Sequence, residues 1–130
     1  MKRTTILVSG LYLASLALSP AWAQGARNKS MVLQQGAGNA AGIQQTGTAN
    51  DAGVLQFGRG NTGIVTQEGT GNAACLVQAG RNLGGSIQQT GDYQTTGVFQ
   101  TRTGIREIPV EACAKATTRA HVWAYAVGRR

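Results

Sequence analysis

The chain contains few of the residues from which catalytic and metal-binding sites are built. Among 130 residues there is one histidine, and there are five acidic residues. General acid–base catalysis needs titratable groups held close together, and no two of these acids form a close pair along the sequence. We therefore expect that the chain is not an enzyme and that it binds no cofactor. The residues concerned are His121, Asp51, Glu68, Asp92, Glu107 and Glu111.

Cysteine is also scarce, because Cys75 and Cys113 are the only two. Two cysteines and one histidine make a poor zinc site, and the acids are too few for a calcium-binding nonapeptide solenoid. Two cysteines outside the cytoplasm allow a single disulfide, which is too little to support a small fold on its own. The alternative is that both thiols stay free and the C-terminus is disordered.

Long apolar runs are absent apart from Ile6–Leu18 near the N-terminus. This run is shorter than the roughly 20 residues of a membrane helix, and it is followed by Pro20 and by the small-x-small sequence Ala21–Ala23. The pattern predicts a signal peptide over residues 1–23, so the mature protein would be secreted and would have no membrane span. An uncleaved N-terminal anchor is the alternative.

Glutamine, glycine and asparagine, in contrast, return at fixed intervals. Seven glutamines are spaced eleven residues apart; a glycine stands two residues after the first six, and an asparagine five residues after the first four. Two residues before each glutamine the side chain is always aliphatic. The glutamines are Gln34, Gln45, Gln56, Gln67, Gln78, Gln89 and Gln100; the glycines are Gly36, Gly47, Gly58, Gly69, Gly80 and Gly91; the asparagines are Asn39, Asn50, Asn61 and Asn72.

Each repeat of eleven residues reads as one short strand and one tight turn. In an extended segment Ala41, Ile43 and Gln45 share one face, and the Gly- and Asn-rich stretch after each glutamine is typical of turns. A glycine in every repeat, at about 1 kcal/mol each, disfavours a helix. The sequence therefore predicts an all-β chain rather than a helical repeat.

The residue before each glutamine shows that the true period is twenty-two. It alternates between apolar and polar without exception, as two sheets with different surroundings would require. We therefore predict a two-sheet β-solenoid with two strands in each coil, an apolar outer face on one sheet and a polar outer face on the other. The series is Leu33, Gln44, Leu55, Thr66, Val77, Gln88 and Phe99.

Stacked coils would place equivalent side chains above one another, about 4.8 Å apart. We expect the glutamines and the asparagines to bond amide to amide along the stack, with the aliphatic residues filling a narrow interior. Gly58–Gly63 spells a dinucleotide-binding motif, but another strand is expected after it instead of the required helix. Arg59 and Arg81 occupy the same turn position, twenty-two residues apart. Three interpretations stay open: they keep this edge soluble, they bind anionic polysaccharide, or they are only solvated.

The repeat between Gln34 and Gln56, with Gln67–Ala74 continuing it, resembles that of the curlins, the subunits of the functional amyloid fibres called curli. The resemblance covers roughly residues 31–101. It implies a secreted subunit that polymerises with itself and with other curlins, after export through a dedicated channel with accessory factors. Asparagine is replaced at Leu83 and Gln94, and glycine at Arg102, so the roles of major subunit and of nucleator both stay open.

These observations divide the chain into a signal peptide at 1–23, a linker at 24–30, a repeat domain at 31–101 and a basic tail or cap at 102–130. We expect the tail to contain a strand at 120–127 and to cover the apolar face of the solenoid, which would bring Cys113 to the outward-pointing Cys75. The basic tail also allows contact with anionic surfaces, whereas specific nucleic-acid binding is not expected.

Two functional classes remain. The first is a secreted structural subunit that forms curli-like fibres for adhesion and biofilm matrix at the bacterial cell surface. The second is a soluble secreted β-solenoid that binds a ligand such as a glycan or ice through a flat face. A regular face of paired threonines would favour the second class, and the sequence lacks one.

Overall fold

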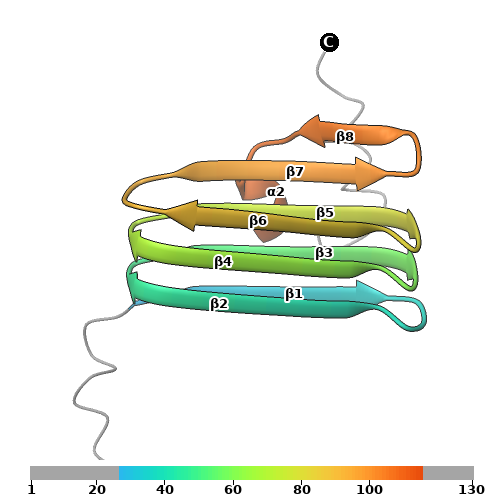
Figure 1. Ribbon diagram of the computed structural model, residues 1–130, viewed down its shortest axis with the longest axis horizontal. Helices are drawn as coiled ribbons and strands as arrows, with labels where there is room; N and C mark the ends of the chain where they lie inside the picture. Colours follow the sequence, from blue (N-terminus) through green and yellow to red (C-terminus); the bar gives the residue numbers. More distant parts are fainter. Residues whose placement is uncertain (1–26, 116–130) are drawn as a thin grey trace, which may run out of the picture.

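The computed structural model describes residues 27–115, and most of these residues lie in β-strands (Figure 1). Eight strands are followed by one short helix. The predicted signal peptide, the predicted strand at 120–127 and His121 lie outside the described residues. The elements are β1 (Lys29–Gln35), β2 (Ala40–Thr48), β3 (Asp51–Arg59), β4 (Thr62–Thr70), β5 (Ala73–Arg81), β6 (Gly84–Thr90), β7 (Thr95–Thr101), β8 (Gly104–Glu107) and α2 (Glu111–Lys115).

The strands coil into two sheets of a β-solenoid, as the sequence predicts. Sheet A has the order β1-β3-β5-β7-β8, and sheet B has the order β2-β4-β6. The pairs from β1 to β7 are parallel and keep a constant register of twenty-two residues, for example Val32 with Val54 and Ile43 with Val65. We call each set of two consecutive strands, one in each sheet, a rung. The predicted 22-residue rung is therefore confirmed.

The connections between successive strands are shorter than the length of the Gly- and Asn-rich stretches indicates. β2, β3 and β4 each span nine residues, which leaves two residues for each connection. The residue four places after each of the first six glutamines adopts the left-handed conformation, with φ between 55° and 69°. Glycine provides this conformation without strain, but non-glycine residues also adopt it here. The six corner residues are Gly38, Ala49, Gly60, Gly71, Asn82 and Tyr93.

The interior between the sheets is narrow and combines aliphatic side chains with glutamines. Val54, Val65 and Leu76 are at most 1% exposed, and Gln56 and Gln67 are fully buried beside them. The residue seven places after each of the first six glutamines is Ala, Gly or Thr, and it is small because the opposite sheet is close. A Cβ atom placed on Gly63, for example, would lie only 3.0 Å from a methyl group of Val54. Val32, in the first rung, is by contrast 49% exposed.

The two outer faces differ, as the alternation in the sequence predicts. On sheet A the outward residues Leu55, Val77 and Phe99 are buried in a second apolar cluster, with Leu33 at its margin. We call this cluster the apolar strip. It is covered by Ile108, Val110 and α2. No part of the described chain covers sheet B in this way, and its outward residues Gln44, Ile64 and Gln88 are exposed.

Candidate functional site: the amide ladders and the ends of the solenoid

Two columns of glutamine amides run along the interior, one in each sheet. In sheet A, Gln34 donates from Nε2 to Oε1 of Gln56 at 2.7 Å, and the chain of bonds continues to Gln78 at 2.8 Å and Gln100 at 3.0 Å. In sheet B the same bonds join Gln45, Gln67 and Gln89, at 2.9 and 2.8 Å. All seven glutamines of the repeat therefore meet amide to amide.

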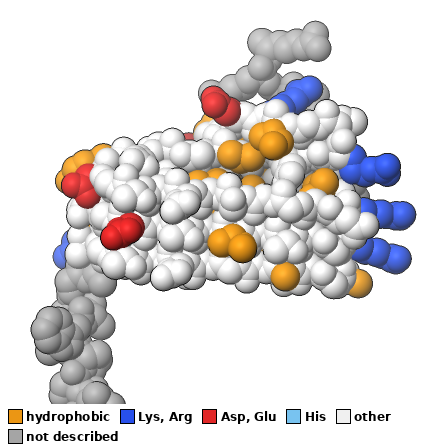
Figure 2. All heavy atoms as spheres, in the orientation of Figure 1, with side chains coloured by type: hydrophobic (Ala, Val, Ile, Leu, Met, Phe, Trp, Pro, Cys, Tyr) orange, Lys and Arg blue, Asp and Glu red, His pale blue; other side chains and the backbone are white. Residues whose placement is uncertain are grey.

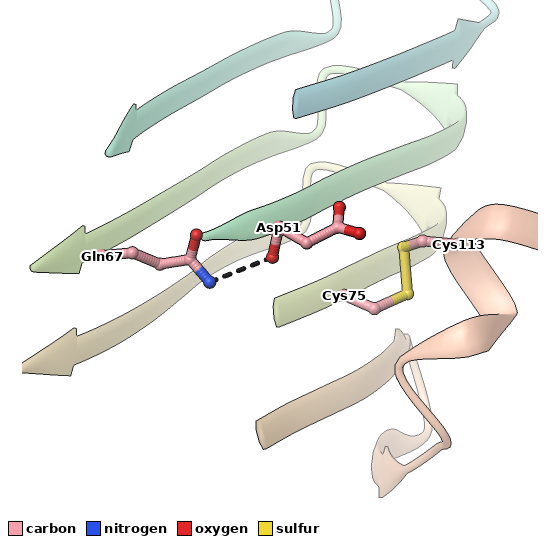
Figure 3. Close-up of a disulfide and its surroundings, with 4 residues drawn as sticks. All are labelled: Asp51, Gln67, Cys75 and Cys113. Carbon is pink, nitrogen blue, oxygen red and sulfur yellow. Dashed lines mark hydrogen bonds between the residues drawn. A yellow bond between two sulfur atoms is a disulfide. The ribbon is translucent and has the colours of Figure 1, made fainter. Parts of the chain in front are cut away.

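Each glutamine after the first also ties its strand to the opposite sheet. Nε2 of Gln67 donates to the backbone carbonyl of Asp51, at the beginning of β3, at 3.0 Å (Figure 3). Nε2 of Gln56 does the same at Ala40 in β2, and Nε2 of Gln78 at Thr62 in β4. Both amide hydrogens are thus used, and within residues 27–115 no buried side-chain nitrogen or oxygen lacks a partner. This explains why a polar residue is stable in so narrow an interior.

The asparagines stack in the same register, but they do not bond amide to amide. Oδ1 of Asn50 accepts the backbone N–H of Asn72 at 3.1 Å, and its Nδ2 donates to the carbonyls of Thr46 and Gly69. The expected asparagine ladder is therefore wrong in this detail. The shorter side chain lies at the corner, where unpaired backbone groups are nearer than the next amide. Asn28, which the analysis of the repeat missed, accepts from Asn50 in the same way and stands twenty-two residues before it.

The glycines two residues after glutamine are needed for close contacts between rungs near these corners, which turn propensity alone does not predict. Gly47, Gly58, Gly69 and Gly80 lie inside strands, whereas Gly36 and Gly91 lie in the bends that follow β1 and β6. A Cβ atom on Gly58 would collide with the carbonyl oxygen of Gly80 in the next rung. That carbonyl accepts the Nδ2–H of Asn61 at 3.2 Å. Glycine and asparagine are thus coupled, since the glycine makes room for the carbonyl that the asparagine binds.

The ladders give the solenoid a direction. Each glutamine donates toward the C-terminal rungs and accepts from the N-terminal side, so the first rung ends in two acceptors. Among the described residues, nothing donates a hydrogen bond to Oε1 of Gln34 or Gln45. β1 and β2 also lie at the outer edges of their sheets, where backbone N–H and C=O groups have no neighbouring strand. The first rung is therefore an open template for another strand pair.

At the other end of the chain, residues 108–115 fold back over sheet A. Cys75, outward-pointing on β5, forms a disulfide with Cys113 of α2, with 5.6 Å between the Cα atoms (Figure 3). Space for this segment comes from two glycines at the position of Cys75 in neighbouring strands. A Cβ atom on Gly53 would lie 2.6 Å from Cβ of Cys113, and one on Gly97 would collide with the carbonyl of Ile108. The spacing of Gly53, Cys75 and Gly97 by twenty-two was visible in the sequence, but its meaning depends on the covering segment.

Reducing the disulfide is expected to lower the free energy of unfolding by about 4 kcal/mol, because it closes a loop of 38 residues in the unfolded chain. Urea unfolding with and without reductant measures this difference. The double variant Cys75→Ala/Cys113→Ala is the control, since its unfolding midpoint should not respond to the reductant. Equal midpoints for the oxidised and reduced wild type would contradict the prediction.

Basic side chains line up along one edge of the solenoid (Figure 2). Arg59 and Arg81 are exposed and paired in register at the ends of β3 and β5. Within residues 27–115 no group of histidine, cysteine and acidic residues is arranged to hold a metal ion. No helix in the same range is long and apolar enough to cross a membrane. The strand β4 begins at Thr62, within Gly58–Gly63, so a strand stands where a dinucleotide site requires a helix.

Stacked parallel rungs with continuous amide ladders define the class of cross-β solenoid proteins. Residues 39–69 match the family model of the curlin associated repeat. Over these residues the match confirms the resemblance to the curlin repeat seen in the sequence. Searches of curated proteins and of solved structures give no match.

Proposed function

We propose that the chain is a secreted structural subunit that assembles into curli-like fibres at the bacterial cell surface, where the fibres serve adhesion and the biofilm matrix. The observation that carries this proposal is the first rung. Its two strand edges and the Oε1 atoms of Gln34 and Gln45 are unpaired. In every later rung, the same groups bind the rung before it.

A second copy would extend the solenoid with the bonds already present inside it. Gln100, the last glutamine of its sheet A ladder, would donate to the acceptor of Gln34 when its β7 pairs with β1 in parallel. Val32, now 49% exposed, would be covered by such an addition. Stacking therefore removes apolar surface from water and continues the ladder of sheet A at the same time.

The proposed partners follow from the repeat. They are further copies of this chain and other curlin subunits, together with the secretion channel and accessory factors that curlins use. The same geometry suits a major subunit and a nucleating subunit, because both present a rung to the next molecule. The basic edge with Arg59 and Arg81 gives the fibre a surface for anionic polymers.

The proposal is tested by fibre growth of the mature chain, residues 24–130, and of two variants of adjacent residues. Ile43 points into the interior of the first rung and Gln44 points to solvent. Ile43→Lys would bury a charge at the junction, so we expect seeded growth to slow at least about tenfold, whereas Gln44→Lys should grow at nearly the wild-type rate.

Growth is followed by thioflavin fluorescence, and fibre diffraction should show the strand spacing of about 4.8 Å. Secondary-structure content of the soluble variants controls for loss of fold. A wild-type chain that stays soluble or gives only amorphous material, even with seeds, would contradict the proposal. So would equal growth of the two lysine variants.

A further inference from the structure

The two ends of the solenoid are not equivalent. At the N-terminal end, β1 and β2 both have open edges, whereas at the C-terminal end β8 pairs with β7 (Figure 1). β8 is also the only strand of the described chain that runs antiparallel to its neighbour. It lies in sheet A at the position that the next parallel strand of a continuing solenoid would take.

The departures from the repeat fall at this same end. Asn61 accepts the backbone N–H of Leu83 at 3.1 Å, and Leu83 has no side-chain acceptor for a following rung. Gln94 accepts no backbone N–H either, although its Nε2 keeps the bond to the carbonyl of Thr90. Arg102 stands where the repeat has glycine. Within the described residues, the series of asparagine contacts thus ends at Leu83 on one side of the solenoid and at Gln94 on the other.

The strand β8 is held in place by the segment that follows it. The N–H of Ile108 donates to the carbonyl of Gly97 at 3.0 Å, on the outer face of sheet A. Ile108 and Val110 pack against the apolar strip, and Cys113 is bonded to Cys75. Residues 104–113 are therefore fixed to the solenoid by strand pairing, by apolar contact and by a covalent bond.

Among residues 27–115, sheet B has no counterpart of this cover. β6 is its last strand, and beside it lies a hollow of about 460 Å³ that reaches the interior residues Leu76 and Val98. Ile105 of β8 also lines this hollow and is 67% exposed. The C-terminal end is thus half closed: one sheet is finished, and the other still exposes an edge and part of the apolar interior.

We propose that residues 104–113 form a cap that blocks the docking of a second copy of this chain at the C-terminal end. β8 occupies the place beside β7 that β1 of the incoming copy needs. Sheet A has one parallel strand more than sheet B, so one strand place stays between β6 and the incoming β2. The first rung stays open, but it can receive another copy only after β8 of that copy has left β7. Opening of the cap then limits assembly. This inference rests on the proposed function, in which copies stack rung on rung.

The cap is tested with two variants of the full mature chain, kept oxidised. Backbone N–H groups alternate in direction along a strand, so one of residues 105 and 106 donates toward β7. Ile105→Pro/Arg106→Pro removes that donor, whereas Ile105→Ala/Arg106→Ala removes the same side chains and keeps it. Gly97→Val displaces Ile108 without touching β8. Its control is Thr66→Val, on the outer face of the central strand β4 of sheet B, away from the cap and from both end strands.

We expect the proline variant and Gly97→Val to shorten the lag of thioflavin-detected growth at least about tenfold, and the two controls to keep the wild-type lag. Equal lags for the wild type and all four variants would overturn the cap. So would slower growth of both the proline variant and Gly97→Val. Fibres would still form in that case. Absence of fibres from every protein, even with sonicated seeds, would instead refute the proposed function itself.

Discussion

Replacing Gly58 with alanine is expected to unfold most of the repeat domain. The φ angle of 126° at Gly58 is rarely adopted by other residues, and an added Cβ atom would collide with the carbonyl oxygen of Gly80. Strain and overpacking together cost about 3 to 5 kcal/mol. That is a large part of the stability of a small domain, which is about 5 kcal/mol at the low end.

The matched control is Gly42→Ala, in the neighbouring strand β2. Gly42 has an ordinary strand conformation, and a Cβ atom there would meet nothing within 4 Å. Alanine should leave stability unchanged or raise it by about 0.5 kcal/mol. Urea unfolding followed by circular dichroism compares the two variants. Similar midpoints for both would show that the contact between Gly58 and Gly80 is not what the repeat requires.

Replacing Gln67 with leucine is expected to lower the free energy of unfolding by about 3 to 5 kcal/mol. Leucine has a similar volume, so the loss comes from hydrogen bonds and not from a cavity. Gln67 accepts from Gln45 at 2.9 Å and donates to Gln89 at 2.8 Å and to the carbonyl of Asp51 at 3.0 Å. Gln67 is fully buried, so water cannot replace these partners.

The control for this change is Gln88→Leu, on the exposed outer face of sheet B. It introduces the same side chain without breaking an interior bond, so its effect should stay within about 0.5 kcal/mol. The two urea midpoints are compared under oxidising conditions, which keep the disulfide intact. Equal loss in both variants would mean that the interior ladder contributes nothing specific to stability.

The repeat region could be predicted closely because its structure follows from local periodicity. The interval of eleven between glutamines gave the strand length, and the alternation from Leu33 to Phe99 gave the two sheets. Stacking then forced identical residues into contact. The corners were less predictable, because the asparagine side chain chooses between the next amide and the nearer backbone, and only coordinates show which is in reach.

The C-terminal cover shows the opposite case. Residues 102–115 carry no repeat, so no pattern indicated that β8 would pair antiparallel with β7 or that α2 would lie over the apolar strip. Cys75 was expected to point outward and to meet Cys113 beneath a covering tail. The strand expected at 120–127 lies outside the described residues, and the cover observed is formed by residues 108–115.

The sequence by itself determined the rung, its register and its interior, because each of these depends on contacts between residues twenty-two apart that repeat with the same chemistry. Only the tertiary structure decided how the solenoid ends. The position of β8, the space left by Gly53 and Gly97, and the bond from Cys75 to Cys113 are each made once, between segments far apart in the chain. A contact made once leaves no period in the sequence from which it could be inferred.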